Sequence, residues 1–218
     1  MQGLIGGDRV LSFFACRRHN KARWVNWQSA LTGLVLLIVA VSLTAQEHIA
    51  DVIAKATAGD PVAQDALGVS YAMGNRDVPR NYEAALKWFR KSAAQGYTES
   101  QMHLGAMYEM GRGVTKDLDE ARKWYLLAAK QGNTHAQTKL GITCELGRGV
   151  AQDFAEAAKW YRLAAEQGYA EAQYKLGRLY EQGLGVPLNN AEAANWYQKA
   201  SVQGNREATQ ALVAMGAK

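Results

Sequence analysis

The sequence predicts an all-α fold, a solenoid of antiparallel helix pairs with a single helix at each end. Three observations predict it: a repeat of about 36 residues, capping residues at the same place in every repeat, and a glycine where each second helix should end. A fixed period of this length is typical of stacked helical repeats. The array also follows a long apolar segment, which is expected to form an N-terminal helix of its own.

The repeat is set by tryptophan and glycine. Four of the six tryptophans lie 36 residues apart, and an aromatic residue follows each one: Trp88-Phe89, Trp124-Tyr125, Trp160-Tyr161 and Trp196-Tyr197. Four Gln-Gly pairs keep the same interval, at Gln95-Gly96, Gln131-Gly132, Gln167-Gly168 and Gln203-Gly204. Agreement at this many positions predicts units at 59–95, 96–131, 132–167 and 168–203, a capping helix at 46–58 and a second cap at 204–218.

Each unit is predicted to hold two helices. The second begins at a good N-cap residue, Asn81, Asp117, Asp153 or Asn189. A glutamate three positions later predicts a capping box in three units; Ala84 takes that place in the first, which should cap less well. The second helix then stops at the periodic glycine.

Each first helix carries a glycine in its middle, at Gly68, Gly105, Gly141 or Gly177. A mid-helix glycine costs about 1 kcal/mol relative to alanine, so we expect a neighbouring helix too close for a Cβ. Cys144, where other units have tyrosine, is expected to be a small buried filler. The Gly-x-Gly connections are expected to be turns, since they lack the strand and the GK[ST] of a phosphate loop.

These residues resemble the Sel-one-like repeat family, relatives of the tetratricopeptide repeats, with the pattern AQxxLGxxYxxGxGVxxDxxxAxxWYxxAAxQG. The match is closest at 101–132 and 173–204 and covers about two-thirds of the chain. The resemblance implies a right-handed α-solenoid that acts as an interaction scaffold without catalytic residues. The sequence itself contains no GxSxG, HExxH or CxxC motif, and its histidines lack metal-ligand spacing. We therefore expect no enzyme activity, no cofactor and no metal site.

The net charge of +5 belongs mainly to residues 1–45, which carry +4. The nearly neutral body lacks the basic surface of a nucleic-acid binder. Basic residues before the apolar run 30–45 predict a signal peptide or a membrane anchor spanning 24–45, and both alternatives stay open. Either would export the repeats, to the periplasm or to the outer face of an inner membrane.

The tetratricopeptide analogy predicts that one face of the first helices lines a concave surface that binds a protein or peptide partner. The predicted binding residues are Asp65, Val69, Met73, Glu99, Met102, Ala106, Glu109, Met110, Thr138, Ile142, Glu145, Leu146, Tyr174, Arg178 and Glu181. The row of Glu109, Glu145 and Glu181 suggests an acidic stripe for a basic or amphipathic peptide. The alternative is that these glutamates are solvated charges with local helix partners.

The sequence thus favours a non-catalytic scaffold of a bacterial-type cell envelope. The alternative function is an envelope hydrolase acting on a β-lactam or peptidoglycan-like substrate, with carboxylates such as Glu109 and Glu145 as acid and base. Equal spacing gives these carboxylates similar surroundings, whereas acid/base catalysis needs two that differ.

Overall fold

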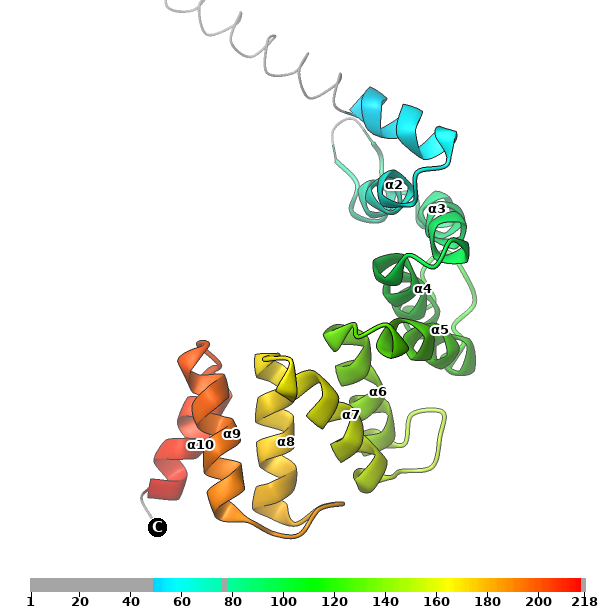
Figure 1. The fold of residues 1–218 in the computed structure, drawn as a ribbon. Helices are drawn as coiled ribbons and strands as arrows, with labels where there is room; N and C mark the ends of the chain where they lie inside the picture. Colours follow the sequence, from blue (N-terminus) through cyan, green and yellow to red (C-terminus); the bar gives the residue numbers. More distant parts are fainter. Residues whose placement is uncertain (1–48, 76–77, 217–218) are drawn as a thin grey trace, which may run out of the picture. The chain divides into compact units, whose positions relative to one another are not determined.

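The computed structural model describes residues 49–75 and 78–216 (Figure 1). The chain divides into two compact units, Met1–Asp51 and Val52–Lys218. The described part of the first is limited to residues 49–51, so the predicted apolar helix and the membrane segment 24–45 lie outside the described residues. Among the residues that are described, no helix has the length and apolar character needed to cross a membrane.

The second unit is a stack of helix pairs, as predicted. Residues 52–58 are helical and are followed by α2 (Pro61–Met73), α3 (Tyr82–Ala94), α4 (Thr98–Met110), α5 (Leu118–Lys130), α6 (Thr134–Leu146), α7 (Phe154–Glu166), α8 (Ala170–Gln182), α9 (Asn190–Val202) and α10 (Arg206–Gly216). From α2 onward, each helix packs against the one before it and the one after it. The colours of Figure 1 therefore run in sequence order along the stack.

The second helices begin at the predicted caps. The Asp117 carboxylate accepts from the Glu120 amide at 2.9 Å, and Asn81, Asp153 and Asn189 cap in the same way. The predicted capping box is nevertheless half wrong: the Asp117 amide donates to the Tyr108 carbonyl, and the Glu120 carboxylate pairs with Lys123. In the first unit, the amide of the N-cap residue Asn81 donates in the same way to the Tyr71 carbonyl of the first helix. Alanine at position 84 therefore costs this unit no hydrogen bond.

The mid-helix glycines make room for a ring. A Cβ added to Gly141 would lie 2.5 Å from the Tyr161 ring, and Gly68 meets Phe89 in the same way. The expected close neighbour is thus an aromatic side chain of the unit's own second helix, the residue that follows each periodic tryptophan. The glycine and the aromatic residue are two halves of one contact.

The Gly-x-Gly connections are turns, as predicted. Gly147 ends α6 in the left-handed conformation, with φ 65°. Gly113 also has a positive φ, and a Cβ there would come within 2.6 Å of the Tyr82 carbonyl of the preceding unit. The second glycine of the motif therefore lets the connection rest on the neighbouring helix start.

Both ends of the described stack are half units. The Ala56 carbonyl accepts from the Gln64 amide at 3.1 Å, as the Ala129 carbonyl accepts from Gln137. Residues 52–58 therefore take the place of the last turns of a second helix and lie against the first unit. At the other end, α10 takes the place of a first helix against α9.

Candidate partner-binding face

The predicted binding residues all lie on the first helices α2, α4, α6 and α8, but they differ in how much solvent they see. Four are exposed: Met73, Glu99, Met110 and Leu146. Nine are half-buried: Val69, Met102, Ala106, Glu109, Ile142, Glu145, Tyr174, Arg178 and Glu181. The remaining two, Asp65 and Thr138, are buried.

Asp65 joins two helices, and Thr138 is buried within its own helix, so neither lies on a solvent-facing surface. The Asp65 carboxylate accepts from the Ser100 hydroxyl at 2.5 Å and lies 3.0 Å from His103 Nδ1. The Thr138 hydroxyl donates to the Thr134 carbonyl one turn earlier. Their placement on the partner-binding face is therefore corrected: the helical period assigned them to it, but neighbouring side chains cover them.

The glutamate row accepts hydrogen bonds from buried tyrosines. The Tyr125 hydroxyl donates to Glu109 at 2.7 Å and the Tyr197 hydroxyl to Glu181 at 2.8 Å, while Tyr161 donates to Glu145 at 2.5 Å. Burial, together with this hydrogen bond, raises the pKa of each of the three phenols. A buried hydroxyl without an acceptor costs about 1–3 kcal/mol. Each glutamate therefore stabilises its own unit by accepting this hydrogen bond.

The sequence contains a signal for this pairing that the repeat pattern alone does not show. In the first unit, the aromatic residue is Phe89, which has no hydroxyl, and the glutamate position is Ala72. The carboxylate is thus present in the three units with a hydroxyl to satisfy and missing from the one without.

Basic side chains also lie near Glu109 and Glu145. Lys139 Nζ lies 3.2 Å from Glu109, and Arg148 lies 3.8 Å from the same carboxylate. Arg178 lies 3.8 Å from Glu145. Glu109 and Glu145 are therefore paired both with a tyrosine of the same unit and with cations of the next one, while Glu181 accepts from Tyr197 of its own unit. The row is a set of paired carboxylates more than an open acidic stripe.

A row of apolar side chains lies beside the glutamates. Met73, Met110 and Leu146 each immediately precede the glycine that ends a first helix, and they are 75%, 48% and 52% exposed. The fourth unit has Gln182 at this place. We call these three residues the apolar row. Such exposure at one repeated position is not required by packing within the described residues.

Paired glutamines join the helices of each unit. The Gln167 amide donates to the Gln137 side chain at 2.9 Å, and the Gln137 amide donates to the Ala129 carbonyl at 3.1 Å. Gln95 with Gln64, Gln131 with Gln101 and Gln203 with Gln173 repeat the first bond. The repeat pattern contains both glutamines of each pair, but it does not show that the two side chains hydrogen-bond to each other.

Arginine-tyrosine contacts join some neighbouring units. Arg90 of α3 donates to the Tyr108 hydroxyl of α4 at 2.7 Å, and Arg162 of α7 donates to Tyr180 of α8. At the junction between them, the same positions hold Leu126 and Cys144. Cys144 is buried, as expected of a filler, and burial raises the pKa of its thiol. A thiol held in its protonated form is a poor nucleophile.

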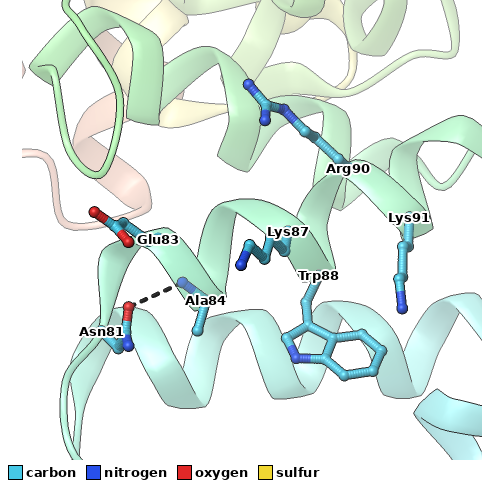
Figure 2. A pocket seen from close by; sticks show the side chains of 7 residues that line it. All are labelled: Asn81, Glu83, Ala84, Lys87, Trp88, Arg90 and Lys91. Atoms are coloured by element: carbon cyan, nitrogen blue, oxygen red, sulfur yellow. Dashed lines mark hydrogen bonds between the residues drawn. The ribbon is translucent and has the colours of Figure 1, made fainter.

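Two open hollows lie on the second helices, away from the predicted face. One, of about 410 Å³, runs along α3, where Lys91 Nζ sits 4.4 Å from the centre of the Trp88 ring (Figure 2). The other, of about 430 Å³, lies along α7 beside Gly185. Basic and apolar side chains dominate both hollows. Within residues 49–75 and 78–216, no group of three or more His, Cys, Asp or Glu side chains is placed to hold a metal.

The comparisons with known proteins agree with this architecture. The Sel1 repeat model matches residues 61–97, 98–133, 134–169 and 170–205, which together make up more than half of the chain. The chain belongs to the Sel1 repeat family. Proteins built from Sel1 repeats are generally protein-interaction scaffolds.

Two solved Sel1 repeat structures are similar to this chain. A Sel1 repeat protein from Oxalobacter formigenes is 37% identical over 77% of the chain and 48% of its own length, with a TM-score of 0.71. The protective antigen c5321 of uropathogenic Escherichia coli, described as displaying an SLR fold, is 39% identical over 73% of the chain and 34% of its own length, with a TM-score of 0.69. The chain thus spans a third to a half of these two proteins. No match was found among curated proteins.

Proposed function

We propose that this Sel1 repeat protein is a non-catalytic scaffold of a bacterial-type cell envelope, which holds a protein or peptide partner against its first helices. The observation that carries the proposal is the apolar row. Packing within the described residues leaves Met73, Met110 and Leu146 exposed, whereas it uses the neighbouring glutamates. Exposed apolar side chains aligned over successive elements are typical of interaction sites.

The chemistry of the face favours an amphipathic segment as the partner. Methionine adapts its shape to different apolar surfaces, and two of the three residues in the apolar row are methionine. The glutamates next to the row are already paired with Lys139, Arg148 and Arg178. The apolar side of the partner is therefore expected to supply most of the affinity, and its charges the orientation.

The hydrolase alternative has less support. Glu109 and Glu145, the carboxylates proposed as acid and base, each accept from one buried tyrosine and each have an arginine 3.8 Å away. Acid/base catalysis needs two carboxylates with different environments. The tyrosine and arginine contacts that both carboxylates share favour a repeated structural task.

The test is site-specific photo-crosslinking in the native host, with the reactive group at position 110. The captured partner would be identified by mass and purified, and its affinity measured for the single variants Met110→Ser and Leu146→Ser. A loss of affinity of about tenfold to a hundredfold is expected for each variant, since burying one such side chain is worth about 1.5–3 kcal/mol. Leu127→Ser is the matched control: Leu127 lies on α5 and is 46% exposed. Equal affinity for the Met110, Leu146 and Leu127 variants would refute the proposed face.

The acidic-stripe hypothesis needs a gentler change than charge reversal, which would also remove the acceptor of a buried tyrosine. Replacing Glu109, Glu145 and Glu181 together by glutamine removes the charge and keeps an oxygen for each hydroxyl. If the stripe attracts a basic peptide, the affinity should fall and lose its dependence on salt. Unchanged affinity would refute the stripe and leave the apolar row standing.

We also propose that residues 24–45 attach the protein to a membrane or direct its export, with the repeats outside the cytoplasm. The charge pattern of the N-terminus supports this topology. Intact mass of the protein from its host separates a removed signal from a retained anchor. Protease added to spheroplasts should digest the repeats; complete protection until lysis would contradict export.

A further inference from the structure

Positive charge gathers on the later part of the second helices α3, α5, α7 and α9. From the sixth residue of each onward, these helices carry eight exposed Lys and Arg side chains and a single acidic one, Glu166. The eight are Lys87, Arg90, Lys91, Lys123, Lys130, Lys159, Arg162 and Lys199. We call these eight residues the basic face. The repeat body is nearly neutral as a whole only because acidic residues elsewhere balance them.

The helix dipole and internal ion pairs do not account for the basic face. A basic residue in the last turn stabilises any helix, and α3, α5 and α9 have one there, but α2, α4, α6 and α8 have none. Among the described residues, two members of the face lie on carboxylates: Lys123 on Glu120 at 2.9 Å and Lys159 on Glu156 at 3.1 Å. The other six have no acidic partner there, so their charge is available to an anionic ligand.

Leucine and tryptophan side chains lie between these cations. Leu127 and Leu163 are each 46% exposed. Each follows a half-buried tryptophan, Trp124 or Trp160, by three residues, so that the two share one side of their helix. Exposed leucine beside tryptophan and basic residues is typical of surfaces that lie at a membrane–water interface. A phosphate backbone in water, bound through its charge, would give these leucines no apolar partner.

An apolar hollow with two cations in its lining lies within this face. Alanines at positions 155 and 158 open it, because the second unit has Asp119 and Arg122 at these places. Glu166 is the one acid of the lining. The hollow has a volume of about 430 Å³, and its other side chains are Ala155, Ala158, Leu163 and Val186 with Lys159 and Arg162. An apolar floor beside cations fits a molecule that joins an acyl chain to a phosphate.

We propose that the basic face lies against the surface of an anionic phospholipid membrane. The cations contact lipid phosphates, and Leu127 and Leu163 enter the boundary between headgroups and acyl chains. Anionic lipids attract each Lys and Arg near their surface, and an apolar side chain that reaches this boundary adds to the affinity. The inference is independent of the partner-binding face on the first helices. It also does not depend on residues 24–45, whose proposed attachment to a membrane would only bring the face nearer to lipid.

The test measures how well lipid shields the face from a neutral quencher. The full 218-residue chain, with Cys16 replaced by serine and the buried Cys144 retained, carries a fluorescent label at Leu163→Cys or, as the control, at Met110→Cys on the first helices. Each is reconstituted into vesicles of phosphatidylglycerol or of phosphatidylcholine, and acrylamide is added. We expect the quenching constant at position 163 to be at least threefold lower in phosphatidylglycerol, with no difference at position 110.

Three results would overturn the proposal. The first is an equal quenching constant at position 163 in the two kinds of vesicle. The second is equal protection at position 110, which would show that the second helices have no special role. The third is protection at position 163 by double-stranded DNA, added to phosphatidylcholine vesicles, as strong as that by phosphatidylglycerol. That result would make the basic face a general site for polyanions.

A charge-removing variant provides a second measurement. At the phosphatidylglycerol content that gives half-maximal protection, Lys130→Gln should lower the ratio of protected to free label about fivefold, the contribution of one basic residue near an anionic surface. Lys175→Gln on α8 is the matched control: it removes the same charge, and within the described residues neither lysine has an acidic partner. High salt should also weaken the protection. Equal effects of the two variants, or protection that salt does not reduce, would refute binding through the basic face.

Discussion

The contact between Tyr161 and Glu145 predicts a specific pattern of coupling between two substitutions. The Tyr161 side chain is fully buried, and its hydroxyl donates to the Glu145 carboxylate at 2.5 Å. Glu145→Ala leaves that hydroxyl buried without its acceptor, which should cost about 1–3 kcal/mol. Tyr161→Phe should cost about 1 kcal/mol. The double variant reproduces the Phe89 and Ala72 pair of the first unit and should be little less stable than Tyr161→Phe alone.

The measurement is native-state hydrogen exchange of the amides in α6 and α7, because repeat arrays can open locally and need not unfold in two states. The coupling energy from the double-mutant cycle is expected to be about 1–3 kcal/mol, the loss expected for Glu145→Ala. Glu166→Ala is the control: Glu166 is exposed at the end of α7, and its removal should change the opening energy by less than about 0.5 kcal/mol. Additive losses, or a Glu145→Ala variant as stable as the control, would refute the assigned task of the glutamates.

Three further predictions test the packing of the units. Gly141→Ala should lower the melting temperature, because the added Cβ would lie 2.5 Å from the Tyr161 ring. This overpacking costs about 1–3 kcal/mol, whereas alanine gains about 1 kcal/mol in helix propensity. A raised melting temperature would contradict the contact. Burial raises the pKa of Tyr125 and Tyr161 in the folded state, so absorbance at 295 nm should show these two phenols still protonated at a pH where exposed tyrosines ionise. The free energy of unfolding should fall as pH rises above about 10, because the unfolded state then loses these protons and the folded state keeps them. Titration of all tyrosines near pH 10 would contradict this prediction. Gln137→Leu should lower the urea midpoint by removing two buried hydrogen bonds, an effect of about 1–3 kcal/mol, and an unchanged midpoint would show that the glutamine pairs are dispensable.

The fold could be predicted because the repeat records it several times over. Helix ends depend on residues that are close together in the sequence, such as the N-caps Asp117 and Asp153 and the periodic glycines. The sequence alone therefore predicts where the helices begin and end. The side chain that packs against a given residue, however, often belongs to a different helix and lies far away in the sequence. The helical period alone placed Asp65 on a solvent-facing surface, although Ser100 of the next unit covers it.

The candidate site was predicted less completely for the same reason. The period identified the row of Glu109, Glu145 and Glu181, but it could not show that a tyrosine 16 residues later donates to each one. Comparing the first unit with the others would have revealed the pairing, since Phe89 and Ala72 change together. Interactions across units, such as that of Lys139 with Glu109, join residues 30 positions apart, and the helical period does not show which of these residues meet.

The hydrogen bonds of the glutamines and tyrosines have a consequence for how such proteins change in length. The buried tyrosines Tyr125, Tyr161 and Tyr197 each donate to a glutamate of their own unit. The first-helix glutamines Gln64, Gln137 and Gln173 donate only to a backbone carbonyl of the preceding helix, which any sequence provides. Whole units can therefore be duplicated or deleted, and these glutamines and tyrosines still find a hydrogen-bond partner at the new junction. The number of repeats becomes a freely adjustable property, and a lineage can lengthen its binding surface by copying a module already able to fold.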